Sequence, residues 1–467
     1  MSIYTDAVTA FQQVVDGAQA EYERRLADAD QAITGLRTEN ATLLERIREL
    51  ETLPPVVKVA GAVKLGTGYK IPADAIRVSA SQSLHLAYAA APSGATIVLE
   101  GAVHRVTKTL TLSKPVTIMA DGEAWLDFEG KVQLPIVGKS KTSILGIGLR
   151  NGNTITTTDP NSGVTFASGS DGSLIENCVF EDFTGSWPVA TRRGTGALNI
   201  YSNRDVTVRN CTFLRSGVCH IQSEKTTNLT IEWCKFEDAN VSKQPMMQPV
   251  TAAMKHTRAR NIHIAHNVVT GIPDCGGIWL DVYCYQYLIA HNTVTGSPGT
   301  EAKIEAELSG FGDIAFNDVT QGPAQYSIMV LDSNDTRVWG NKLNHGSAAQ
   351  LEVCDDGRRN INDIHKAEGV TGEVRNVQII NNQFGPDYGY FQAHVWDKST
   401  TPKPAETFAT RVEGNGPAKW GWGRNTQSGG ATVRQTRTSA QLDATYPAVA
   451  RGNDPARPAA TPADLST

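Results

Sequence analysis

The feature that most constrains this chain is a short motif that recurs through its middle. The motif is an apolar residue, two others, Cys or Asn, one other residue, and then Phe, Val or Leu. Repeats of this kind indicate a solenoid, in which each repeat packs only on its neighbours. Eight copies share this register, with the Cys or Asn at Cys178, Cys211, Cys234, Asn267, Asn292, Asn317, Asn341 and Asn382.

The spacing of the motif predicts how the chain coils. Successive Cys or Asn positions are 33, 23, 33, 25, 25, 24 and 41 residues apart. One coil therefore takes about two dozen residues, and the longer intervals mark loops inserted at a corner. Short β-branched runs broken by Gly, Pro and Asn fill each coil, as expected for strands. The sequence thus predicts an all-β solenoid, a right-handed, single-stranded parallel β-helix, over residues 81–385.

Each position of the motif has a physical role in such a coil. Side chains alternate along a strand, so the first and last positions point inward, and like residues stack about 4.8 Å apart in successive coils. An Asn at a bend can bond its amide to neighbouring coils and to the turn backbone. Cys178, Cys211 and Cys234 are expected to fill the same position as small apolar plugs.

Residues 1–53 have a different period. Their apolar positions repeat every 3.5 residues or so for six heptads, which is typical of an α-helical coiled coil rather than of an amphipathic helix lying on its own domain. The d positions are Val8, Val15, Tyr22, Ala29, Leu36, Leu43 and Leu50, and the a positions are Gln12, Gln19, Leu26, Ile33, Asn40 and Ile47.

The heptads leave the number of strands in the coiled coil open. Asn40 at an a position commonly fixes register and strand number. Ile and Leu at a with Leu at d favour a dimer, while Gln12 and Gln19 weaken that preference. Pro54-Pro55 ends the helix, and residues 54–80 are interpreted as a neck. Residues 386–435 are interpreted as an aromatic-rich C-terminal cap and residues 436–467 as a poorly ordered Pro/Ala-rich tail.

Composition excludes several classes of partner. The net charge is −5 and no basic stripe carries interleaved aromatic residues, so no nucleic acid is expected. No apolar run approaches the roughly 18 residues of a membrane span, and no secretion signal is evident, so no membrane insertion is expected. Seven cysteines without CxxC pairs predict neither a disulfide framework nor a metal site. No cofactor is expected.

The repeats and the lead-in over residues 83–99 resemble the start of a pectate-lyase-like right-handed β-helix. The predicted coiled coil in front, the missing secretion signal and the aromatic C-terminal stretch resemble phage tail-spike or minor tail proteins. This resemblance implies a homotrimer, although the heptads allow a dimer. It also implies attachment to other virion tail proteins through the N-terminus, a place on the virion tail, and a host cell-surface glycan as partner. Fold alone does not select a reaction.

The likeliest place for chemistry is a second strand in each coil, whose outward residues are expected to form a polar column. The column is predicted to contain Asn199, Tyr201, His220, Gln222, Lys255, His256, Trp279, Asp281, Lys303, Glu305, Glu307, Asp332, Glu352 and Asp355. Glycoside hydrolysis needs two carboxyl groups about 5 Å apart for retention or roughly 6.5 to 9.5 Å apart for inversion. Adjacent coils offer the first distance and alternate coils approximately the second.

Asp281 with Glu305, or Glu305 with Glu352 two coils on, are therefore the candidate catalytic pairs. The candidate glycan-binding residues are Trp279, as a sugar platform, with Lys255, Glu307, Asp332, Trp420 and Trp422. The alternative is an ordinary solvent-facing polar sheet, on which Lys255 and Lys303 balance the acids. For Trp420 and Trp422 the alternative is that they cap the last coil.

Other chemistries have weaker support. Asp355-Asp356 is similar to the acidic pair of polygalacturonase-like hydrolases, but the Asn-x-Asp and Gly-His elements of that family are not evident. A lyase would use a base such as Arg258 or Arg260, and no Asp-rich calcium loop accompanies them. His266 and His291 are expected to stack on the outside. The sequence thus predicts a tail spike that binds host polysaccharide, with a depolymerase and a purely structural tail protein as alternatives.

Overall fold

The computed structural model describes residues 63–66, 69–132, 134–152, 163–184, 196–243, 251–358, 369–386, 392–397, 409–416, 419–425 and 432–438. The predicted coiled coil over residues 1–53 and nearly all of the predicted tail lie outside the described residues, so both stay predictions. A short helix, α2 (Leu84–Ala90), follows the first strand, β1 (Ile76–Val78). The Ser83 side chain at its N-terminus accepts a hydrogen bond from the Leu86 amide.

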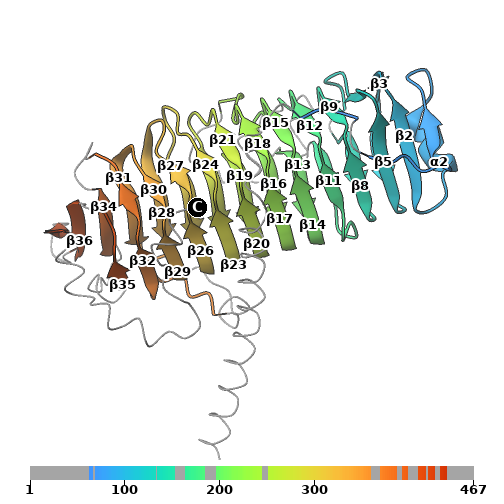
Figure 1. Ribbon diagram of the computed structural model, residues 1–467. Helices are drawn as coiled ribbons and strands as arrows, with labels where there is room; N and C mark the ends of the chain where they lie inside the picture. Colours follow the sequence, from blue (N-terminus) through green and yellow to red (C-terminus); the bar gives the residue numbers. More distant parts are fainter. Residues whose placement is uncertain are drawn as a thin grey trace, which may run out of the picture. The chain divides into compact units, whose positions relative to one another are not determined.

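The strands of the described residues form three long sheets, and the chain visits them in turn (Figure 1). Sheet 1 contains β1 (Ile76–Val78), β2 (Ala95–Glu100), β5 (Val116–Asp121), β8 (Thr142–Leu145), β11 (Leu174–Glu176), β14 (Arg204–Arg209), β17 (Thr227–Glu232), β20 (Arg260–Ala265), β23 (Tyr285–Ala290), β26 (Gly310–Ala315), β29 (Asn334–Trp339), β32 (Val377–Ile380) and β35 (Ala409–Glu413).

Sheet 2 contains β4 (Leu110–Leu112), β7 (Ile136–Gly138), β10 (Val164–Phe166), β13 (Gly196–Tyr201), β16 (Cys219–Glu224), β19 (Ala252–Thr257), β22 (Gly276–Asp281), β25 (Ala302–Glu307), β28 (Ala324–Leu331), β31 (Gly346–Asp355), β34 (Ala393–Asp397), β36 (Lys419–Asn425) and β37 (Thr432–Thr438). Sheet 3 contains β3 (Val103–Arg105), β6 (Trp125–Asp127), β9 (Gly148–Arg150), β12 (Val179–Glu181), β15 (Thr212–Leu214), β18 (Lys235–Glu237), β21 (Val268–Thr270), β24 (Thr293–Val294), β27 (Asp318–Val319), β30 (Lys342–Leu343) and β33 (Gln383–Phe384).

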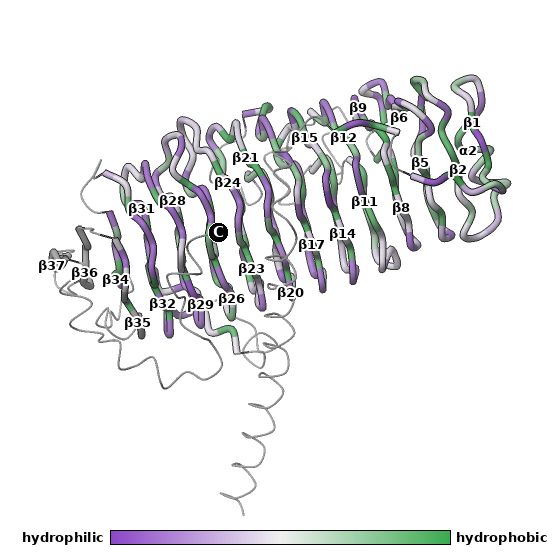
Figure 2. The backbone as a smooth tube through the Cα atoms, viewed as in Figure 1, coloured by the Kyte–Doolittle hydropathy of each residue, from purple (hydrophilic) through white to green (hydrophobic). Residues whose placement is uncertain are grey.

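This arrangement is a parallel β-helix, as the repeats predict. Neighbouring strands pair in parallel through the stack, and the last pair, β36 with β37, is antiparallel. The motif detected in the sequence ends at residue 385, but parallel stacking continues, since β34 pairs with β31 and β36 pairs with β34. Hydrophobic and hydrophilic residues alternate along the strands (Figure 2), so one face of each strand fills the core.

The core is built from ladders of like residues. Phe180, Phe213 and Phe236 are fully buried and stack with ring centroids 4.6 and 5.0 Å apart. At the bend, the Asn292 Oδ1 accepts hydrogen bonds from both the amide and the Nδ2 of Asn267. The predicted inward Asn ladder is therefore confirmed, and Asn415 extends it one coil further than the motif.

The cysteine positions differ from the prediction of apolar plugs. Cys178, Cys211 and Cys234 are buried as expected, but each thiol lies within hydrogen-bonding distance of backbone carbonyl oxygens, as Cys234 does with Val208. The Cys234 amide also donates to the side chain of Asn267, so the asparagine ladder continues directly from the cysteines. A thiol thus replaces part of the polar role of Asn at this bend. All seven cysteines are buried and unpaired.

The residue before each Cys or Asn sits in a tight turn with left-handed backbone. Trp233, His266, His291 and Phe316 all have φ between 54° and 58° there, a conformation that is unfavourable for large side chains. Their rings stack along the outside, which offsets part of that strain. The ring centroids of His266 and His291 are 4.9 Å apart, and the two ring planes are nearly parallel. The predicted outer stack is therefore confirmed.

Candidate functional site

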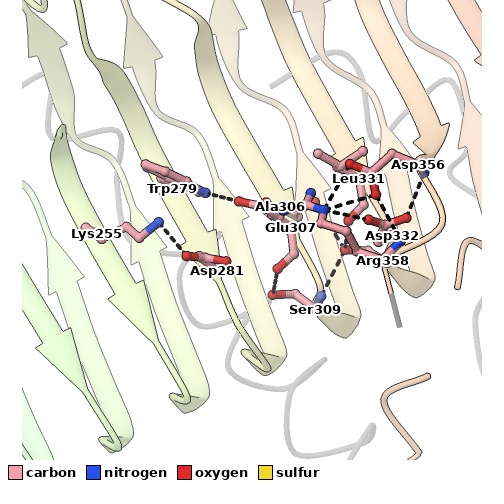
Figure 3. A network of polar contacts seen from close by, with 11 residues as sticks. Lys255, Trp279, Asp281, Ala306, Glu307, Ser309, Leu331, Asp332, Asp356 and Arg358 are labelled. Carbon is pink, nitrogen blue, oxygen red and sulfur yellow. Dashed lines mark hydrogen bonds and ion pairs between the residues drawn. The ribbon is translucent and has the colours of Figure 1, made fainter. Parts of the chain in front are cut away.

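The outward side chains of sheet 2 form two columns in the middle of the β-helix. Parallel register places Lys255, Trp279, Glu305, Met329, Glu352 and His394 in one column. Asp281 and Glu307 lie two residues further along β22 and β25, and they begin the second column. Because adjacent coils are about 4.8 Å apart, side chains of neighbouring strands contact one another directly. We give the name acidic network to a set of eight residues on this face: Lys255, Trp279, Asp281, Glu305, Glu307, Asp332, Asp356 and Arg358. Figure 3 shows the members that bond to one another.

Lys255 anchors one end of the acidic network. Its Nζ donates to Asp281 Oδ2 at 2.7 Å and lies over the Trp279 ring. The lysine side chain is fully buried, so loss of hydration lowers its pKa, and the carboxylate of Asp281 opposes that shift. The ion pair and the ring together hold a charged amine where water does not reach it.

Glu307 joins the two ends of the network. The Trp279 Nε1 donates to Glu307 Oε2 at 2.9 Å, and the other carboxylate oxygen pairs with an Nη of Arg358 (Figure 3). Arg358 Nε also contacts Asp332 at 3.2 Å and Asp356 at 2.9 Å. One guanidinium therefore binds carboxylates from three successive coils, which its planar fork of donors allows.

Asp332 and Asp356 form a pair with opposite tendencies to ionise. Burial, together with the neighbouring carboxylate of Asp356, raises the pKa of Asp332 to about 9. The pKa of Asp356 is lowered, because the hydrogen bond from Asp332 and the charge of Arg358 outweigh its own burial. At neutral pH the protonated Asp332 therefore accompanies an ionised Asp356, the separation that acid and base roles require.

Glu305 differs from every other acid in the network. Its side chain is only 4% exposed, and it makes no hydrogen bond or ion pair with any described residue. Its register neighbours are Trp279 in the preceding coil and Met329 in the next. Burial raises its pKa well above the usual range, and nearby Glu307 adds to the shift. Burial and the neighbouring carboxylate therefore both favour the protonated form of Glu305.

The structure brings together most of the residues that the sequence singled out. Lys255, Trp279, Asp281, Glu307 and Asp332 belong to one bonded network. Glu305 and Glu352 share a column two coils apart, with Met329 between them, as predicted. Glu352 Oε2 bonds to the Nδ1 of His394 at 2.9 Å. His394 lies on β34, one coil beyond the acidic network.

The expectation of a solvent-facing polar column is wrong. Lys255 and Asp332 are 0% exposed, and Glu305 and Glu352 are 4% and 1% exposed. Stacked coils place side chains directly above and below one another, so outward does not mean hydrated. For the same reason Trp279 is not an open platform, because Lys255 covers one face of its ring and Glu307 binds its Nε1.

Three further residues of the predicted column lie elsewhere. His220 packs against the core rings of Phe213 and Phe236. His256 pairs with Ser223 in the interior, because the register places these two side chains on the inward face. Lys303 donates to the carbonyls of Val319 and Asn344, so it does not balance the acids.

Other predicted site residues are placed by backbone register alone. Trp420 and Trp422 lie on β36, opposite Ala393 and Val395 of β34. β36 is two strands beyond β31 in sheet 2, so these positions are outside the acidic network. The choice between capping and sugar stacking for this pair stays a prediction.

Sequence reasoning missed Arg358. It lies beyond the end of β31, outside the repeat motif, and it enters the site because its side chain reaches Asp332 and Glu307 of the two preceding coils. The signal available was an arginine two residues after an acidic pair, within the longest interval between motif positions. Within the described ranges no group of His, Cys, Asp and Glu side chains is arranged to hold a metal ion, and no helix there is long and apolar enough to cross a bilayer.

Comparison with known proteins supports the fold. A family model described as a right-handed beta helix region matches residues 140–294. The match agrees with the predicted right-handed coiling of the chain. No curated protein matches the chain. The periplasmic alginate epimerase AlgG is 13% identical, with 73% of this chain and 79% of that chain covered and a TM-score of 0.46.

Two further solved structures are similar at the same level. The Dettilon tailspike protein is 14% identical, with coverage of 69% of this chain and 60% of that chain and a TM-score of 0.49. The A-module of a mannuronan C-5 epimerase from Azotobacter vinelandii is also 14% identical, with coverage of 72% and 91% and a TM-score of 0.49.

Proposed function

We propose that this chain binds a polysaccharide on the outward face of sheet 2, at the acidic network. The observation that carries the proposal is the concentration of interacting charged groups from successive coils on one face of an otherwise apolar-cored solenoid. Burying charges costs stability, and apolar residues would hold the coils together at least as well. Ionisable groups with strongly shifted pKa values cluster at functional sites more often than elsewhere.

The accessible parts of the network suit sugar hydroxyls. The side chains of Arg358 and Asp356 are 37% and 31% exposed, while Trp279 and Asp281 are partly exposed. Carboxylates accept and guanidinium groups donate hydrogen bonds, and sugar hydroxyls do both. A face that repeats every 4.8 Å or so also gives an extended polymer several equivalent contacts in a row.

The biological role that we propose is that of a phage tail-spike or tail-fibre subunit that adsorbs to host surface polysaccharide. Support comes from the heptads of residues 1–53, which predict self-association, and from the resemblance of the predicted coiled coil and aromatic C-terminal stretch, on either side of a β-helix, to tail-spike proteins. In this role the chain is a homotrimer on the virion tail, joined to other tail proteins through its N-terminus. A purely structural tail component is the alternative, and it would bind no glycan.

Hydrolysis of the bound glycan is a second candidate function, favoured by the difference between Glu305 and Asp281. Glu305 lies beside Trp279 with its pKa raised by burial, while Asp281 pairs with Lys255 on the adjacent coil. An acid with a raised pKa near a carboxylate in another environment is the arrangement that general acid catalysis of glycoside cleavage uses. Glu352, two coils from Glu305, is the alternative partner, at a spacing closer to that of inverting enzymes.

Equilibrium binding tests the proposal. The full chain is titrated with capsular and cell-wall polysaccharides of candidate hosts, alongside Arg358→Ala and a matched surface control, Arg209→Ala, which removes an ion pair with Glu176 on sheet 1. Binding that weakens in the first variant and persists in the control supports the proposal. Binding that is equal in both, or absent throughout, contradicts it.

A further inference from the structure

The acidic network has more carboxyl groups than cations to match them. Among the described residues that face this site, the positively charged side chains are Lys255 and Arg358. The carboxyl groups whose charges act on one another there are Asp281, Glu301, Glu305, Glu307, Asp332 and Asp356. Asp332 is protonated at neutral pH, but the other five carboxyl groups still outnumber the two cations, so a ligand that enters this site meets a local excess of acid.

Both cations are already engaged. Lys255 pairs with Asp281, and Arg358 is shared by Glu307, Asp332 and Asp356. Glu305 remains, more than nine-tenths buried and with no hydrogen bond or ion pair to any described residue. A buried polar group without a partner is costly, so a group supplied from outside would stabilise it.

The chemistry of that outside group follows from the local charge. A uronate or sulfate would place another negative charge beside the carboxylates, which like-charge repulsion disfavours. A neutral hydroxyl could bond to Glu305 but would leave the excess charge unmatched. An ammonium group supplies several donors and a positive charge together, and its hydrogen bonds to carboxylates are about twice as strong as neutral ones.

We infer that the polysaccharide bound at the acidic network carries free amino groups, one of which is received by Glu305. This inference rests on the proposed function and narrows it to one class of glycan. It also assigns Glu305 a role in specificity, because this glutamate is the acid of the network that no described residue pairs with.

Three oligosaccharide series of matched length test the inference: glucosamine oligomers, their N-acetylated counterparts, and galacturonate oligomers. Affinities are measured by calorimetry at neutral pH and low salt, because acid would protonate the carboxyl groups that are to receive the amine. We expect the amine series to bind at least about tenfold more tightly than the N-acetylated one. Glu305→Gln should remove that preference, while Glu237→Gln, in an exposed ion pair on sheet 3, should retain it.

The outcomes separate this inference from the proposed function. If the N-acetylated or galacturonate series binds as tightly as the amine series, and Arg358→Ala weakens that binding, the site is a glycan site but the inference is overturned. If none of the series binds, and no host polysaccharide does either, the proposed function and the inference fail together. A preference for amines that survives Glu305→Gln also overturns the assignment of Glu305.

Discussion

Replacing Asn292 by Ala should be among the most damaging single changes in the β-helix. The Asn292 Oδ1 accepts from the amide and Nδ2 of Asn267, and its Nδ2 donates to Ile264 O, Ala290 O and Asn317 Oδ1, all between 2.9 and 3.0 Å. The Nδ2 group has two hydrogens, so Asn292 makes at most four of these bonds at once. Each such bond contributes about 1 kcal/mol net, so we expect the free energy of unfolding to fall by about 4 kcal/mol. The buried Asn267 amide would also be left unpaired.

Guanidinium denaturation measures this loss, and hydrogen exchange at the Asn267 amide locates it. Asn292→Cys should cost less than Asn292→Ala, because the chain itself uses cysteine at this position in earlier coils. Thr293→Ala, one residue on and half-buried, is the control and should change stability by less than about 1 kcal/mol. An alanine at 292 that costs no more than the control would refute the claim that side-chain amides hold successive coils together.

Three further changes probe the interior and the acidic network. Burial lowers the pKa of His220 to about 3, so this side chain stabilises the fold fully above its unfolded pKa of 6.5 and less as pH falls below it. His220→Phe, which matches the neighbouring phenylalanines, should therefore gain about 1 kcal/mol of stability relative to the wild type when the pH falls from 6.5 to 5.5 in denaturant titrations, and an unchanged difference would contradict this. Lys255→Met should cost about 3 kcal/mol by leaving Asp281 unpaired, and much of that loss should return when Asp281→Leu is added. If the chain hydrolyses its glycan, Glu305→Gln should lower the rate of reducing-end formation about a hundredfold while binding of an uncharged product is kept.

The repeat predicted the fold because each coil must satisfy the same geometry. Asn267, Asn292 and Asn317 occupy one position of a short motif, and that position has one physical solution, the amide ladder. The register of the columns followed from the same motif, which is why Glu305 and Glu352 were placed two coils apart correctly.

The details of the site were harder to predict for identifiable reasons. Lys255 and His256 are consecutive on one strand, so alternation sends one outward and the other inward, and placing both on one face ignored that rule. The burial of Glu305 depends on the size of its neighbours in adjacent coils, Trp279 and Met329. The spacing of the repeat motif does not specify that size. Arg358 lies outside the motif, so its contacts with Glu307 and Asp332 depend on the conformation of the residues after β31, which the repeat does not specify.

The most direct test of the glycan site is an experimental structure of the full chain with a bound oligosaccharide chosen from the binding measurements. The account predicts sugar density on the outward face of sheet 2, in contact with Arg358, Asp356 and Trp279. Density confined to another sheet or to a turn, with this face unchanged, would contradict it.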